Sequence, residues 1–361
     1  MIHPMGEIVV VTGADGPVGR RVVGLALDEP GVERVIAVGR ELGDHPAGSR
    51  RGGEVELVAA PFALDDPRLA ALVRGATRLL HLGARRGLDL DGTGGADVDL
   101  LGTRALLSTL AQVGRVRAVV VLSSALVYGA RSTNPVPLTE ASPVRPNPSI
   151  PAAVERAQLE GMVRAWSAQR GASCALVRPA VVVGPENGRW LARSPWSTAG
   201  LQVSGADAPV QFLHVDDLAS AVVTVCRSGA DGPVNAAPDG WLTVDQVKAL
   251  KGPAPRLRVP RALAVRLTRI GARLGLANDD PATVLAASEP WVVANDRLRG
   301  LGWVPEQTNE EAYVDADRGG PWARLTPRHR QQLALGGMGV VVLGGLGVGA
   351  WLLRRRLRRG R

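Results

Sequence analysis

Short runs of β-branched and other apolar residues recur along the first half of the chain, and each is followed by residues with helical spacing. Continuous apolar runs of this length are typical of strands buried on both faces of a parallel sheet. The alternation predicts an α/β fold with a doubly wound parallel sheet. We expect strands at Glu7–Thr12, Arg34–Val38, Glu54–Val58, Arg78–Leu82, Ala118–Leu122 and Cys174–Val177, and helices at Val18–Leu27, Arg68–Arg74, Val98–Gln112 and Ala152–Gln169.

The alternation weakens after Arg178-Pro179, although a strand at Val210–His214 and a helix at Leu218–Cys226 are expected to return to the sheet. Six prolines within Asn134–Pro151 exclude regular structure there and predict a loop over the sheet. The predicted units are a main domain of residues 1–178 with about 210–235, a small C-terminal substrate lobe of residues 179–209 and 236–323, and a final segment of residues 324–361.

The final segment has a different pattern. The 21 residues 333–353 contain no charged side chain, and as a helix they would span about 30 Å, the thickness of a bilayer's hydrocarbon core. We expect a transmembrane helix there, with the lipid bilayer as a partner; a buried or interfacial apolar helix is the alternative. The chain starts without a cationic and apolar leader. The expected location is therefore a membrane-anchored protein with its globular body in the cytoplasm, while the side on which the tail lies stays open.

The formal net charge of +9 follows this organisation. Nine arginines and no acidic residue occur from Arg324 to the end, so residues 1–323 contain equal numbers of basic and acidic side chains. The basic charge thus indicates a membrane partner and argues against a nucleic-acid partner. Cys174 and Cys226 lie in apolar stretches and are expected to be free thiols. No residue spacing typical of a metal site is present, so we expect no metal.

A glycine-rich turn connects the first predicted strand to the first predicted helix, in the sequence Thr12 to Gly19. Gly13 would allow the tight turn, Gly16 would let the backbone approach a pyrophosphate, and Gly19 would let the helix pack closely on the strand. Pro17 and Val18 would open the helix, whose N-terminus attracts anions. The pattern predicts a dinucleotide site on a Rossmann fold; a purely structural turn is the alternative.

The residues at the end of the second predicted strand indicate which cofactor, NAD or NADP, is favoured. A carboxylate there would hold the ribose of NAD, but the residues are Ala37-Val38-Gly39-Arg40. Because the Arg40 guanidinium can bind a 2′-phosphate, this position favours NADP over NAD. A solvated arginine at a strand end is the alternative.

Six motifs occur in the order typical of one family. After the glycine turn come His81-Leu82-Gly83-Ala84, Ser123 to Gly129, Arg178-Pro179 with Val183-Gly184-Pro185, Phe212 to Asp217, and Leu298-x-x-Leu301-Gly302-Trp303. In this set, over about residues 7–315, the chain resembles the extended short-chain dehydrogenases/reductases and is similar to the NAD-dependent epimerase/dehydratase family.

The resemblance implies a nicotinamide dinucleotide, NADP or NAD, lying across the sheet, with Leu82, Gly83 and Ala84 at the cofactor. It also implies a catalytic hydroxyl, Tyr and Lys, of which Ser124 matches the hydroxyl. The Tyr-x-x-x-Lys pair should open the helix after the proline-rich loop. Here Ala152 stands at the Tyr position and Arg156 at the Lys position. Dimers are common among such relatives, so a homodimer is possible.

A spacing of four residues places Ala152 and Arg156 on one helical face. Arginine can keep the charge and the ribose contact, but it cannot relay a proton. The only tyrosines are Tyr128, which belongs to the fifth-strand motif, and Tyr313, which lies far along the chain. Losing a positioned general acid typically costs a factor of about 10²–10⁴.

Two hypotheses follow. The protein is an oxidoreductase or epimerase with weakened or altered catalysis, acting through Ser124 and Arg156 or a substrate-supplied acid on a nucleotide-sugar, sterol-like or other lipid-associated substrate. Alternatively it is a non-catalytic module that senses cofactor or organises a partner at the membrane. His81 has two interpretations as well, a substitute acid or a core histidine.

Overall fold

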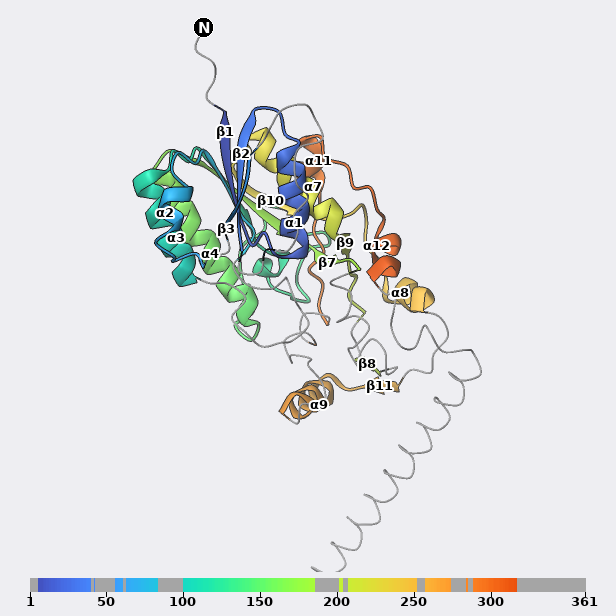
Figure 1. The fold of residues 1–361 in the computed structure, drawn as a ribbon. Coiled ribbons are helices and arrows are strands. Elements are labelled where there is room, and N and C mark those ends of the chain that lie inside the picture. The colour runs from blue at the N-terminus through green and yellow to red at the C-terminus, as the bar shows by residue number, and fades with distance from the viewer. Residues whose placement is uncertain are drawn as a thin grey trace, which may run out of the picture.

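Seven parallel strands form the central sheet of the computed structural model, which describes residues 6–39, 42, 56–60, 63–83, 100–185, 201–203, 207–251, 257–273, 284 and 288–316. The spatial order is β10-β6-β5-β4-β1-β2-β3 (Figure 1). These strands are β1 (Glu7–Thr12), β2 (Val32–Val38), β3 (Glu56–Ala60), β4 (Arg78–His81), β5 (Ala118–Leu122), β6 (Ser173–Pro179) and β10 (Gly232–Ala236).

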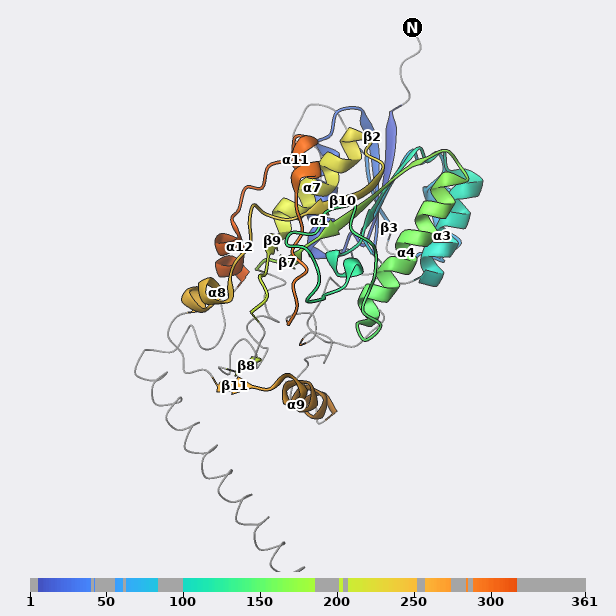
Figure 2. The same cartoon turned by 180° about the vertical axis from the view of Figure 1, so that it is seen from behind.

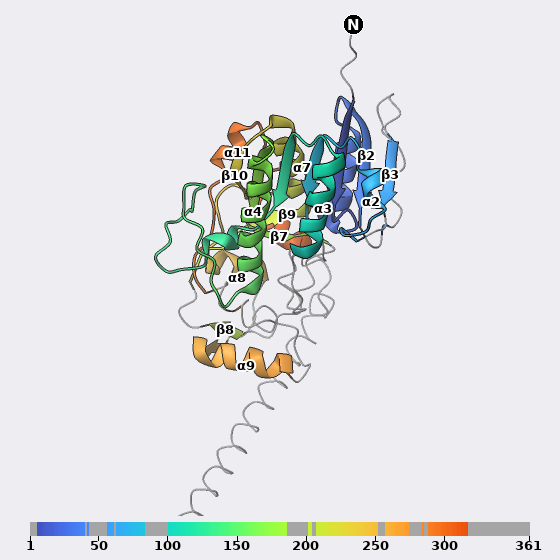
Figure 3. The ribbon, with the colours of Figure 1, turned by 90° about the vertical axis from the view of Figure 1, so that its left-hand side faces the viewer.

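Helices cover both faces of the sheet. On one face lie α1 (Pro17–Leu27), α7 (Val215–Ser228) and the short α11 (Asp296–Gly300). On the other lie α2 (Leu69–Leu72), α3 (Leu100–Val113) and α4 (Pro151–Ala168), as Figures 2 and 3 also show. The predicted doubly wound α/β sheet of the Rossmann type is therefore confirmed.

The apolar runs have the burial that the sequence pattern predicts. Val9 and Val11 of β1 belong to the core beneath α1 and α7, whereas Val10 between them belongs to the core beneath α3 and α4. Successive side chains of a strand point to opposite faces. A strand covered by helices on both faces must therefore be apolar at every position.

The described remainder contains two small parallel strand pairs and three further helices. Strand β7 (Val181–Val183) pairs with β9 (Phe212–His214), and β8 (Leu201–Val203) pairs with β11 (Leu257–Val259). The helices are α8 (Val244–Lys251), α9 (Arg261–Arg273) and α12 (Asn309–Ala316). Leu298 and Trp303, from the range assigned to the lobe, are buried in the core beneath α1 and α7. The predicted domain limits stay a prediction.

Three sequence predictions fall outside the described residues: the spanning segment 333–353, Arg40 and Ala84. Within the described part of the chain, none of the helices combines the length and the apolar character needed to cross a membrane.

Candidate functional site

The order of the strands reverses between β1 and β4, which are neighbours in the sheet although two strands separate them in the sequence. In open α/β sheets, ligands bind at the carboxyl ends of the strands at such a switch point. The loops that follow β1 and β4 meet there. A Cβ atom placed on Gly13 would overlap the carbonyl oxygen of Gly83. The glycine turn and the predicted Leu82-Gly83 segment thus share one small region.

The backbone of the turn requires glycine at two positions. Gly13 has a φ of +68°, a conformation that favours glycine. At Gly19 a Cβ atom would overlap the Gly13 carbonyl oxygen and lie 2.7 Å from Ala14 Cα. Gly16 precedes α1, and its N–H donates to the Gly13 carbonyl oxygen at 3.1 Å, while Pro17 is the first helical residue. The close approach of Gly19 to Gly13 and Ala14 holds the N-terminus of α1 at the switch point. A helix N-terminus in this position fits a pyrophosphate.

Replacing Gly19 by alanine is expected to disturb this turn, because the new methyl group would meet backbone atoms that cannot rotate away. We expect dinucleotide affinity to fall by about tenfold or more, or about 1.4 kcal/mol. Titration of NADH fluorescence measures the change. The matched control is Gly24→Ala in the same helix, where a Cβ atom meets nothing within 4 Å. Equal affinities of the two variants would contradict the role of Gly19.

Arg156 lies with its guanidinium at the carboxyl ends of the central strands. Its side chain leaves α4, is 3% exposed, and donates from Nη1 to the Leu122 carbonyl oxygen at the end of β5 at 2.8 Å. A Cβ atom on Gly83 would lie 3.7 Å from the same Nη1. The positive charge is thus held beside the ends of both β4 and β5.

Ala152 and Ser124 complete the predicted catalytic positions. Ala152 is half-buried in the first turn of α4, one helical turn before Arg156. Ser124 is buried and caps the short helix η1 (Ala125–Tyr128), since its Oγ accepts a hydrogen bond from the Leu126 N–H at 3.2 Å. The structure therefore places Ser124 and Arg156 just beyond the end of β5. That Ala152 stands where relatives carry a phenol stays a prediction of the resemblance.

Neither tyrosine can replace that phenol. The Tyr128 ring is 2% exposed, its hydroxyl donates to Asn235 Oδ1 at 2.8 Å, and the Arg178 guanidinium lies 4.8 Å from the ring centre. Burial raises the pKa of Tyr128. Tyr313 is also 2% exposed and packs against Phe212, with 5.1 Å between the ring centres. Both phenols are therefore parts of the core.

His81 is a core histidine. It is 1% exposed, and its two ring nitrogens lie 2.8 Å from Thr12 Oγ1 and 3.0 Å from Thr103 Oγ1. The ring joins the ends of β1 and β4 to α3. Because both nitrogens are used in this way, the interpretation of His81 as a substitute acid loses its support.

Sequence reasoning missed a buried charged group behind Ser124. Glu160 of α4 forms a two-pronged ion pair with Arg178 of β6, at 2.9 and 2.7 Å, and accepts a hydrogen bond from Ser123 Oγ at 2.6 Å. Glu160 and Arg178 are 4% and 3% exposed. Since Glu160 lies four residues after Arg156, a charge on the same helical face was the available signal. The pair anchors the helix that carries Ala152 and Arg156.

The position of Asp15 was also missed. Asp15 lies in the glycine turn but does not cap α1, because Gly16 precedes the helix and no side chain caps it. A Cβ atom on Gly39 would lie 2.8 Å from Asp15 Oδ1, so the carboxylate stands at the carboxyl end of β2. This is the place where a Rossmann fold receives the ribose of the adenosine half.

A match to a family model shows which protein family the chain belongs to. Residues 9–237 match the NAD dependent epimerase/dehydratase family. The chain belongs to this family. The epimerase/dehydratase match includes the glycine turn, Ser124, Ala152 and Arg156.

Relatives of this epimerase/dehydratase protein share its length and its fold. An uncharacterized protein of Mycobacterium tuberculosis is 28% identical over 343 residues, which cover 91% of this chain and 88% of that protein. Among solved structures, the UDP-glucose 4-epimerase of Thermotoga maritima with UDP-glucose is 18% identical, with a TM-score of 0.60, covering 86% of this chain and 97% of that one. The dTDP-glucose 4,6-dehydratase DesIV of Streptomyces venezuelae, with NAD bound, is 20% identical, with a TM-score of 0.62 and coverages of 86% and 96%.

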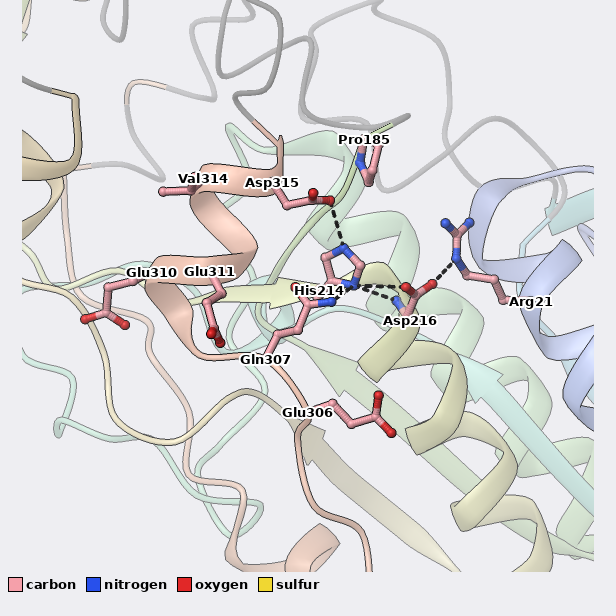
Figure 4. A pocket seen from close by; sticks show the side chains of 10 residues that line it. All are labelled: Arg21, Pro185, His214, Asp216, Glu306, Gln307, Glu310, Glu311, Val314 and Asp315. Carbon is pink, nitrogen blue, oxygen red and sulfur yellow. Dashed lines mark hydrogen bonds and ion pairs between the residues drawn. The ribbon is translucent and has the colours of Figure 1, made fainter.

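A separate cavity of about 600 Å³ lies between α1, α7 and α12 (Figure 4). Five carboxylates line it, and one of them, Asp216, pairs with Arg21. His214 precedes α7, where Gln307 Nε2 lies 2.9 Å from its Nδ1, and Asp315 Oδ2 lies 3.3 Å from its Nε2. The acidic lining disfavours a dinucleotide, which is itself anionic. Among the described residues no group of His, Cys, Asp and Glu side chains is arranged to hold a metal ion.

Proposed function

We propose that this epimerase/dehydratase family member binds a nicotinamide dinucleotide across the switch point, and that the proton transfer typical of its relatives is weakened or altered. The observation that carries the proposal is the position of Arg156 beside the ends of β4 and β5, with Ala152 one turn earlier on α4. The cofactor class is supported by the family and by NAD in the DesIV structure.

The residues of this chain would divide the work as follows. The N-terminus of α1 and the glycine turn would receive the pyrophosphate. Arg156, already held by the Leu122 carbonyl oxygen, would place its charge at the ribose next to the nicotinamide. Ser124 would offer a hydroxyl to the substrate. The bound cofactor would supply hydride transfer. Because the side chain of Ala152 is a methyl group, it can neither hold nor move a proton.

Two functions are compatible with this site. As an enzyme, the protein would act on a nucleotide sugar, or on a sterol-like or other lipid-associated substrate that brings its own acid. Nucleotide sugars are favoured because the solved relatives include enzymes of UDP-glucose and dTDP-glucose. As a non-catalytic module, it would sense the cofactor or organise a partner. The methyl group of Ala152 favours the second function.

We also propose that residues 333–353 tether the protein to a membrane, with the globular body in the cytoplasm. The support for the tether is the uncharged length of this segment and the arginines that flank it. A homodimer is a further proposal, which rests on the resemblance alone. Flotation of the full chain and of a chain ending at residue 330 tests the tether. A full-length protein that stays in solution would contradict it.

Titration of the full chain with NADH and NADPH tests the cofactor proposal. We expect saturable binding of at least one of them, followed by fluorescence of the reduced nicotinamide. Arg156→Met should weaken the binding, because it removes the positive charge while the new side chain is still long and unbranched. Absence of binding for both dinucleotides would contradict the proposed function in both of its forms.

Replacing Asp15 by asparagine should shift the preference toward NADPH. The Asp15 carboxylate stands at the end of β2, so it repels a 2′-phosphate there and opposes the NADP preference that Arg40 predicts. Removing one such charge is worth about threefold to tenfold in the ratio of the two affinities. The control is Asp28→Asn, which removes the same charge at the other end of α1, about 16 Å away. An equal shift in both variants would mean that net charge alone is responsible.

A further inference from the structure

Helix α9 (Arg261–Arg273) has two different apolar faces. Ala264 is fully buried and packs with Val203, Val259 and Val284, and Thr268 is 4% exposed. This face attaches the helix to β8 and β11. On a different side of the helix, Leu263, Leu267 and Ile270 are 46%, 44% and 52% exposed. Their spacing of four and three residues puts them in one stripe. Within the described residues, none of the three belongs to a hydrophobic core cluster, so the stripe takes no part in the attachment through Ala264.

The charges of α9 have one sign. Its sequence contains four arginines and no acidic residue. Arg261 pairs with Glu289 at 2.8 Å. Arg266 and Arg269 are exposed on the face next to the apolar stripe, and no carboxylate within the described ranges pairs with either. An exposed apolar stripe beside exposed arginines is complementary to a bilayer surface with anionic headgroups.

The position of α9 suits such a contact. The helix lies beyond the carboxyl ends of the sheet strands, on the side away from the start of β1 (Figures 1 and 3). In Figure 3 its axis runs crosswise to α3 and α4. A helix that lies flat on a membrane in this position turns the switch-point edge of the sheet toward the bilayer.

We propose that α9 docks on the surface of an anionic lipid bilayer, with Leu263, Leu267 and Ile270 inserted at the acyl boundary and Arg266 and Arg269 at the lipid phosphates. The contact is separate from the proposed spanning segment 333–353. It orients the globular body so that the candidate site faces lipid-associated substrates, a role that rests on the proposed function.

A spin label at position 267 tests the contact in the full chain. The native thiols interfere little, because Cys174 and Cys226 are 5% and 7% exposed and burial raises the pKa of Cys174 to about 11. Leu267→Cys is labelled and combined with phosphatidylcholine vesicles that contain about 30% phosphatidylglycerol, an anionic lipid. We expect collisions with oxygen, which enters the bilayer, to exceed collisions with a water-soluble nickel complex. Val304→Cys, at a position that is 62% exposed and outside α9, is the control and should show the reverse.

Charge reversal by Arg266→Glu and Arg269→Glu in the Leu267→Cys chain should return the label to water. If the nickel complex reaches the label at position 267 as readily as it reaches the control label, the proposal is overturned. The stripe would then be a contact site for a protein partner. Unchanged oxygen accessibility after charge reversal would overturn the assignment of the arginines to lipid phosphates.

Vesicles of phosphatidylcholine alone separate this proposal from the tether. A spanning segment inserts whether or not the lipid is charged, whereas the α9 contact requires anionic lipid. Flotation only with the anionic vesicles would support α9 and contradict the tether. Insertion into both, with a water-exposed label at position 267, would support the tether and overturn the α9 contact.

Discussion

Replacing Ala152 by tyrosine and Arg156 by lysine together is expected to raise nicotinamide-dependent turnover by about 10²–10⁴-fold. Ala152 is half-buried in the first turn of α4, one turn before Arg156, whose guanidinium lies at the ends of β4 and β5. A phenol at position 152 would supply the missing proton donor, and a lysine at 156 would lower the pKa of that phenol by its charge. Nucleotide-sugar conversion, followed by chromatography and by absorbance of the reduced cofactor, measures the change.

The matched control is Ala152→Phe with Arg156→Lys, which adds the same ring without the hydroxyl. This control should stay at the wild-type rate. Equal rates for the phenylalanine and tyrosine variants would show that the ring acts by packing and not as an acid. Wild-type turnover as fast as that of the tyrosine variant would contradict the proposed weakening of the proton-transfer step.

Replacing Glu160 by glutamine is expected to lower the free energy of unfolding by about 3–5 kcal/mol, because it leaves the Arg178 guanidinium buried without its counter-charge. Both oxygens of Glu160 pair with Arg178, and Ser123 donates to one of them. Urea unfolding followed by circular dichroism gives the difference. The helix that loses its anchor also carries Arg156, so dinucleotide affinity should fall with stability.

The control for this loss is Asp245→Asn, which breaks the pair between Asp245 and Lys248 at 2.7 Å on the surface of α8. Solvent screens that pair, so a much smaller change is expected. A loss in Glu160→Gln no larger than in the control would mean that the buried pair contributes little. The anchoring role of Glu160 would then be wrong.

The central strands could be predicted because burial on both faces leaves a continuous apolar run. Strands at the edges of the sheet carry a weaker signal. Strand β3 (Glu56–Ala60) continues past the predicted end at Val58, and as an edge strand most of its described side chains are only partly buried or exposed. Strand β10 at the other edge begins with Gly232-Pro233. Proline is tolerated at the start of an edge strand but hides it from a search for apolar runs.

The glycine turn could be predicted because two of its requirements are local: the positive φ of Gly13, and the close approach of Gly19 to Gly13 and Ala14. The group of Ser123, Glu160 and Arg178 could not, since its members are 37 and 18 residues apart in the sequence and meet only after α4 packs on the sheet. The same holds for Asp15, whose carboxylate reaches the end of a different strand. Pairing of β8 with β11 likewise joins segments that have no common sequence pattern.

Because both tyrosines are buried, neither should interfere when the ionisation of an introduced phenol is followed. Tyr128 and Tyr313 are each 2% exposed, and burial raises the pKa of Tyr128. Nitrating and iodinating reagents should therefore leave the two tyrosines of the folded chain unmodified. In the Ala152→Tyr variant the introduced ring would be the single accessible phenol. Its ionisation could be read directly from ultraviolet absorbance during an alkaline titration, and the charge of Arg156 should displace the midpoint to lower pH.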